Sequence, residues 1–170
     1  MAGIVYELIE VLEEQKECYE GLSTLSDYTQ TAVVNKNLEF LNEVVKTQEQ
    51  FTGRLSVLEK KREGLMKDIA IVTGMDYKEI TITKLIQKLG SENEAANKLE
   101  LLKKEIKELL DELSRKSDLN KMLLEQSLEL VNFTINAIES TKGYSYVGNY
   151  NRPGEEMSVE RQQSIFDTKQ

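Results

Sequence analysis

The chain has 170 residues, of which 30 are acidic and 22 are basic, and its net charge is -8. This acidity disfavours nucleic acid, which needs clustered Lys and Arg against its phosphates, and it disfavours anionic membranes. The sequence has no His and no Gly-rich phosphate loop, which excludes His-based triads and Glu-x-x-His metal sites. We therefore predict a protein that is not an enzyme and that needs neither a metal nor a cofactor.

Cysteine usage and hydropathy indicate where the protein works. The sequence has one cysteine, Cys18, which excludes an internal disulfide and suits a reducing cytosol. Glutamates stand near the start, where a signal peptide needs a basic flank, and no run of about 18 apolar residues is present to span a bilayer. We expect a cytoplasmic protein without membrane insertion.

The first predicted element is a helix over about residues 3–34. Its apolar positions recur at alternating spacings of four and three residues, which is the heptad pattern of a coiled coil. This first seam consists of Ile4, Leu8, Val11, Gln15, Cys18, Leu22, Leu25, Thr29 and Ala32. The polar member Gln15 weakens a core but fixes its register.

A second helix is predicted after Asn37, which is a suitable N-cap, and before Gly74, which is a suitable residue just past a helix end. The short connection makes the first two helices antiparallel neighbours. The seam of the second helix consists of Leu41, Val44, Gln48, Phe51, Leu55, Leu58, Arg62, Leu65, Ile69 and Val72.

A connector follows over residues 75–90. Either Thr81 or Thr83 caps a short helix that Gly90 ends. This short helix carries Leu85, Ile86 and Leu89.

The longest helix is predicted to begin at a capping box made by Ser91 and Glu94. It should extend to about Thr141, just before Gly143. These elements predict an all-α fold: an up-and-down antiparallel helical bundle or coiled coil of three long helices plus a short connecting helix. We expect a helical domain over 1–142 and a flexible tail over 143–170.

The longest helix changes its pattern halfway. Its first stripe is Leu99, Leu102, Ile106, Leu109 and Leu113, and the same heptad then reaches Lys116 and Asn120, which are poor core residues. The pattern resumes in another phase, with Leu124, Leu128, Val131, Ile135 and Ile138. Such a shift is a stutter, so residues 114–118 are either underwound or a true break.

A second stripe accompanies the resumed pattern, so that the two together cover about half of the helix cylinder. Its members are Leu119, Leu123, Gln126, Leu130, Phe133 and Ala137. One interpretation is a helix wedged between two neighbours of the same chain. The other is that a partner covers its end, because a second helix of about 36 residues leaves about 18 Å of a third helix of about 48 residues without a neighbour.

Several segments of the sequence are similar to one known family. "LIEVLEEQKECYEGL", "LSVLEKKREGLMKDIA", "ITITKLIQKL" and above all "LNKMLLEQSLELVNFTINAI" resemble, in their order and spacing, the FlgN family of flagellar type III export chaperones. The resemblance implies a chaperone that binds the C-terminal helical region of hook-associated proteins, which join hook to filament, prevents their premature assembly and delivers them to the export gate. The implied client-binding residues are Leu119, Leu123, Leu124, Leu130, Phe133, Ile135 and Ile138.

The tail is compared with the same family. A tyrosine beside a glycine after the long helix resembles a docking element for the cytoplasmic domain of the export gate, and Tyr144, Tyr146 and Tyr150 are the candidates here. A solubilising tail with incidental tyrosines is the alternative. For the whole protein, the alternative is a structural coiled-coil scaffold that self-associates through its last helix, and a homodimer without client is compatible with both interpretations.

Overall fold

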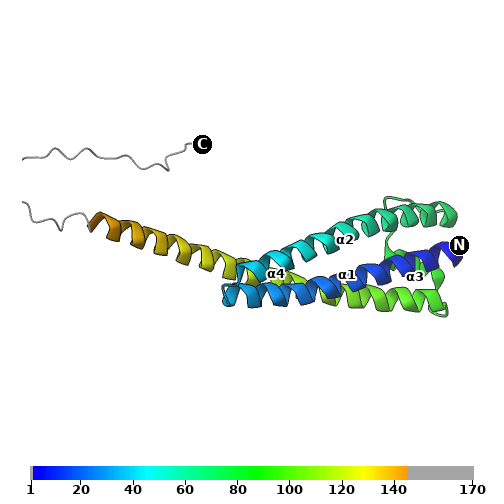
Figure 1. Ribbon diagram of the computed structural model, residues 1–170. Helices are drawn as coiled ribbons and strands as arrows, with labels where there is room; N and C mark the ends of the chain where they lie inside the picture. The colour runs from blue at the N-terminus through cyan, green and yellow to red at the C-terminus, as the bar shows by residue number, and fades with distance from the viewer. Residues whose placement is uncertain (1, 145–170) are drawn as a thin grey trace, which may run out of the picture. The chain divides into compact units, whose positions relative to one another are not determined.

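The computed structural model describes residues 2–144, with side chains from 3 to 140. It contains α1 (Ala2–Val34), α2 (Leu38–Thr73), α3 (Ile82–Leu89) and α4 (Glu94–Tyr144) (Figure 1). Every regular element within the described range is a helix, so the all-α prediction is confirmed. Contacts within the chain separate residues 1–130 from those that follow.

The ends of α2 form as the sequence predicts. The Asn37 side chain accepts a hydrogen bond from the Phe40 N–H at 3.0 Å and so caps the helix start. Gly74 adopts the left-handed conformation with φ 65°, and its N–H points at the carbonyls of the preceding turn. A side chain with a Cβ is strained at this φ, which is why glycine suits the position.

The short helix α3 begins at the first of its two candidate caps. The Thr81 hydroxyl accepts from the Lys84 N–H at 3.2 Å, and Gly90 follows the last residue of the helix. Leu85 is fully buried, so this short element contributes an apolar side chain to the core.

The predicted boundaries of α4 are wrong at both ends. Asn93 caps the helix, because its side chain accepts from the Ala95 N–H at 2.9 Å, and Glu94 is the first helical residue rather than the third. Asn is as good a cap as Ser, so the capping-box pattern does not decide between them. At the other end the helix continues through Gly143 to Tyr144, since an internal glycine costs only about 1 kcal/mol and does not by itself end a helix.

Residues 114–118 are helical throughout, so a break at this point is ruled out. The predicted domain boundary after residue 142 stays a prediction, because the tail beyond Tyr144 lies outside the described residues.

One side of α1 packs against α2, and the two helices run in opposite directions. Gln15 Nε2 donates to Glu59 at 3.1 Å and Gln48 Nε2 donates to the Thr29 hydroxyl at 3.2 Å, so positions rise along α1 as they fall along α2. All nine residues of the predicted α1 seam are buried or half-buried. In α2 the exception is Val72, which is exposed in the last turn.

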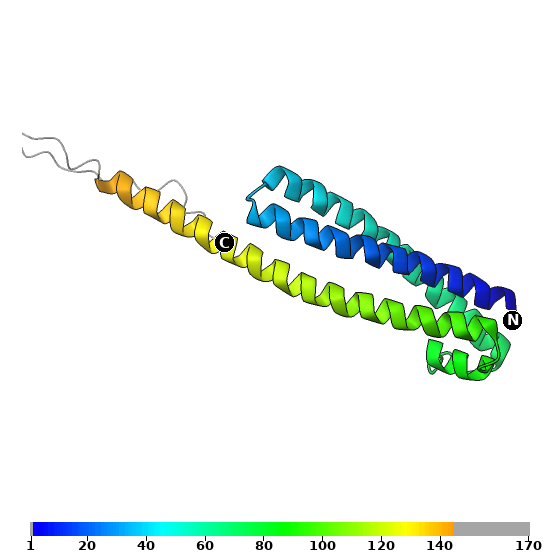
Figure 2. The same ribbon diagram turned by 90° about the horizontal axis from the view of Figure 1, so that it is seen from below.

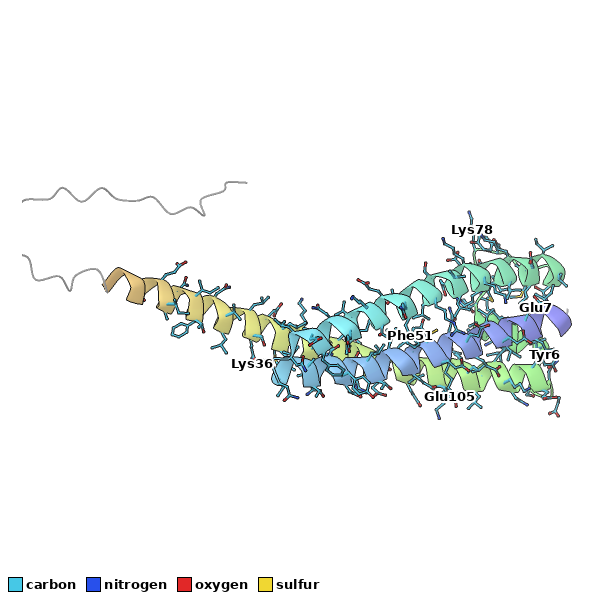
Figure 3. All side chains as sticks on the ribbon, in the orientation of Figure 1. Tyr6, Glu7, Lys36, Phe51, Lys78 and Glu105 are labelled. Carbon is cyan, nitrogen blue, oxygen red and sulfur yellow. The ribbon has the colours of Figure 1, made fainter. Side chains whose placement is uncertain are left out.

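A glycine permits the closest approach in this pair. A Cβ at Gly21 would lie 2.6 Å from the Phe51 ring, so a larger residue would push the ring aside (Figure 3). Arg62, the remaining polar residue of the α2 seam, pairs with Glu59, which also accepts from Gln15. Each polar residue of the two seams therefore has a hydrogen-bond partner.

The other side of α1 packs against α4, and these two helices run in the same direction. Lys16 pairs with Glu105, Ser23 with Glu112 and Asp27 with Lys116, so positions rise together along both helices (Figure 2). A second buried stripe of α1, which the heptad pattern did not predict, lies on this side. Its members are Val5, Ile9, Leu12, Ser23, Ser26 and Val33.

The apolar core gathers where α3 joins the three long helices. Fully buried Leu8, Leu85 and Leu99 belong to one cluster with residues of α2 such as Ile69. Cys18 lies in the same cluster, and burial raises the pKa of its thiol, which keeps it protonated. No described helix combines the length and the hydropathy that crossing a lipid bilayer requires.

Candidate functional site

The described side chains form no cluster of the kind that holds a metal ion. Within residues 3–140, no group of three metal-binding side chains comes together. A groove between α1 and α4 is lined by Glu13, Lys16, Glu17, Glu20, Lys98, Leu101, Leu102 and Glu105. Its Lys16 is paired with Glu105 at 2.8 Å, and this hydrogen bond raises the Lys16 pKa further from neutrality.

The α1–α4 contact becomes polar beyond this groove. Lys116 Nζ lies 2.8 Å from both Asp27 and Glu112, and it donates to the Ser23 hydroxyl at 2.9 Å. The hydrogen bond to Asp27, followed by that to Glu112, raises the pKa of Lys116. Bonds from Lys116 and then Ser23 lower the pKa of Glu112. Lys116, which was expected to be a poor core residue, thus forms a charged contact between α1 and α4.

Asn120 extends the same polar contact. It is buried, and its Nδ2 donates to the Ser26 carbonyl at 2.8 Å. Leu123 and Ser127 follow at spacings of three and four residues and are half-buried. The face of α4 toward α1 therefore keeps one phase from Leu99 to Ser127, and the predicted stutter is wrong. The residues that carry this seam past Leu113 are polar, and the serines and aspartate of "STLSD" in α1 are the signal that could have revealed it.

Leucines flank this seam on both sides in residues 119–130. At 100° per residue, Leu124 and Leu128 lie about 90° to one side of it, and Leu119 and Leu130 lie about 60° to the other. Leu128 is 62% exposed, and Leu119, Leu124 and Leu130 are exposed as well. Of the predicted client-binding residues in this range, only Leu123 is half-buried within its own chain.

The remaining predicted client-binding residues lie in the part of α4 that follows Leu130. Phe133 is 70% exposed, and Ile135 and Ile138 are each about half exposed. Val131, which belongs to the same pattern, is exposed to a similar degree. Four large apolar side chains within eight residues are thus accessible on this segment.

The predicted gate-docking tyrosines are not tested by the structure. The backbone of Tyr144 forms the last residue of α4, and Tyr146 and Tyr150 lie outside the described residues.

Exposed apolar side chains along a helix are one kind of surface through which proteins recognise an amphipathic helix. A comparison with known families makes this specific. The chain belongs to the FlgN family, since the family model, described as FlgN protein, matches residues 1–158. FlgN proteins are flagellar export chaperones that bind export substrates, and the family is not known for catalysis.

The predicted resemblance is therefore confirmed over nearly the whole chain. Neither the curated proteins nor the solved structures include a match to this sequence.

Proposed function

We propose that this protein is a cytoplasmic export chaperone that binds the C-terminal helical region of hook-associated proteins. By covering that region it prevents premature assembly of the client, and it then delivers the client to the export gate. The observation that carries the proposal is the row of exposed apolar side chains on α4, in a chain that belongs to the FlgN family.

The energetics support a client helix as the occupant. Covering one fully exposed large apolar side chain contributes roughly 1.5–3 kcal/mol, so five or six anchors contribute at most a gross ~8–18 kcal/mol. Loss of translational freedom and ordering of the client offset a large part of this. The net binding free energy is therefore well below this gross value, which suits a partner that must later be released.

The rest of the chain acts as a platform and as a connection to the gate. We propose that α1, α2 and α4 form an up-and-down bundle whose core holds the first part of α4. The tail from residue 143 would carry the docking element for the cytoplasmic domain of the gate, with Tyr144, Tyr146 and Tyr150 as its candidates. Both parts of this proposal rest on the family resemblance as well as on the helix contacts.

A second candidate function uses the same exposed row. Apolar side chains on α4 also favour pairing of two copies, which would make the protein a structural scaffold or a homodimer without client. Sedimentation separates the two functions. A chaperone is monomeric or dissociates when the client is added, whereas a scaffold remains a tight dimer whether or not the client is present.

The client-binding proposal is tested with a double variant, Leu128→Asp and Phe133→Asp, and a fluorescent C-terminal segment of a hook-associated protein. We expect the dissociation constant to rise at least about 100-fold, because two apolar anchors are lost. The matched control carries Val57→Asp and Ile71→Asp on α2, which are exposed to a similar degree. Its affinity should stay within about threefold of the unchanged protein.

Thermal melting followed by circular dichroism should show the unchanged transition for both variants, because all four side chains are exposed. A folded α4 variant that binds the segment as tightly as the unchanged chain contradicts the proposed site.

A further inference from the structure

The apolar side chains after Leu130 occupy two sides of the helix. Val131, Ile135 and Ile138 lie within an arc of about 60°, at 100° per residue. Phe133 lies about 160° away from both Val131 and Ile135. Phe133 is 70% exposed and Ile135 is 48% exposed, so both sides are accessible. A single straight helix laid along one of these sides does not reach the other.

The stretch of α4 between residues 119 and 130 has the same two-sided layout. Leu124 and Leu128 lie on one side and Leu119 on the other, with Asn120 between them against Ser26 of α1. An apolar stripe that meets one neighbouring helix is about 100° wide. The exposed pattern here exceeds what one partner helix covers.

The helix α1 shows how two apolar stripes on one helix are covered in this protein. In α1, the stripe that contains Leu8 and Val11 packs against α2, and the stripe that contains Leu12 and Ser23 packs against α4. Two stripes on one helix are therefore covered by two helices. The corresponding stripes of α4 beyond residue 119 are exposed.

Charge indicates the chemistry of the partner. Between residues 118 and 139 the exposed charged side chains of α4 are Asp118, Lys121, Glu125, Glu129 and Glu139, four acidic and one basic, which gives 1 - 4 = -3. At 100° per residue they lie on the arc opposite the α1-facing seam, between the outer edges of the two apolar stripes. Glu129 lies at the outer edge of the Phe133 side. Glu139 and Lys121 lie at the outer edge of the Ile135 side. Because the charge between the two sides is negative overall, Lys or Arg on a docked helix would be attracted to it.

We infer that the C-terminal half of α4 holds two client helices at once, one on each apolar side, and that each carries Lys or Arg beside its apolar stripe. This inference rests on the proposed chaperone function and adds the number and the charge of the bound helices. It also assigns separate contacts: Ile135, with Val131, serves one helix, and Phe133 serves the other.

The test uses the full chain and a stapled amphipathic peptide of about 20 residues with a Leu stripe flanked by Lys. Native mass spectrometry and calorimetry should give two peptides per chain. Phe133→Asp and Ile135→Asp should each leave one peptide bound, and the double variant none. A matched peptide flanked by Glu should bind at least about tenfold more weakly. Val57→Asp on α2 serves as the control and should still bind two.

Any of the following peptide results would overturn the inference: one peptide per unchanged chain at saturation, complete loss of binding in either single variant, or equal affinity for the Lys and Glu peptides. A dimer of the chain that releases no copy when peptide is added would also overturn it, because a second copy then fills one side. A chain that retains a hook-associated client but takes one peptide refutes this inference alone. A chain that retains no client refutes the proposed function.

Discussion

Two helices of this protein each carry two apolar stripes, and the helices differ in whether these stripes are buried. The two stripes of α1 are buried, one against α2 and the other against α4. The two stripes of α4 beyond residue 119 are exposed, with Leu128 and Phe133 among the most accessible side chains. The same periodicity thus leads to a buried core in α1 and to an exposed apolar surface in α4. What separates them is whether the chain supplies neighbouring helices.

The seam of α4 toward α1 changes from apolar to polar side chains along the helix. Apolar side chains fill it around Leu99, and Lys116 and Asn120 take over after Leu113. Hydrogen bonds and charge pairs contribute less net stability than apolar burial, because the separated groups bind water equally well. The stability of residues 1–130 is therefore concentrated toward α3.

The largest expected effect is a difference in the free energy of unfolding between two variants. One changes a buried residue in an apolar stripe of α1, and the other changes an exposed residue in an apolar stripe of α4. Leu12→Ala, in the second stripe of α1, should lower the free energy of unfolding by roughly 2–5 kcal/mol, because it leaves a cavity in the core. Ile135→Ala should change it by less than about 0.5 kcal/mol, since that side chain is already half in water. Urea denaturation measures both. Equal losses would show that Ile135 is buried in solution.

A smaller effect is expected at the polar part of the seam. Asn120→Asp should destabilise the protein by roughly 1–3 kcal/mol, because a carboxylate replaces the group that donates to the Ser26 carbonyl. Asn120→Leu should be neutral within about 1 kcal/mol, since the Ser26 carbonyl keeps its bond within the α1 helix. The same denaturation assay compares the two variants. If Leu is the more harmful substitution, apolar packing and not the hydrogen bond decides this position.

The smallest effect is a pH dependence at Glu112. Bonds from Lys116 and Ser23 lower its pKa below 4.5, and the nearby charges are Asp27 and Arg115. A lowered pKa contributes stability above about pH 4.5 that is lost as the pH falls through the folded-state value. The stability difference between the unchanged chain and Glu112→Gln should therefore shrink from pH 7 to pH 3. A difference that stays constant over this range would mean that the carboxylate charge does not matter.

Much of the fold could be predicted from residues that are close together in the chain. Asn37, Thr81 and Gly74 act where the sequence places them, because a cap depends on residues within one turn. The seam of α1 against α2 could be predicted as well, since its four-three spacing continues from Ile4 to Ala32 with Gln15 and Thr29 as its polar members. The second stripe of α1 was missed because Ser23 and Ser26 interrupt its apolar pattern.

Six of the seven predicted client-binding residues of α4 are exposed, but the reasoning about the seam beside them was wrong. Lys116 and Asn120 read as poor core residues only when their partners in α1 are unknown. Leu123, expected to face a client, is half-buried in its own chain. The client-binding role of the other six residues is an inference from exposure and family membership, and the variants described above test it.

The sequence by itself determined the helices apart from the ends of α4, the antiparallel order of the first two and the family, because these follow from patterns within short segments of the chain. Only the tertiary structure decided that α1 packs on both sides, that Lys116 and Asn120 belong to an interface, and that Phe133 and Ile135 face water. The physical reason is that periodicity specifies which side of a helix is apolar, whereas burial depends on what lies against that side.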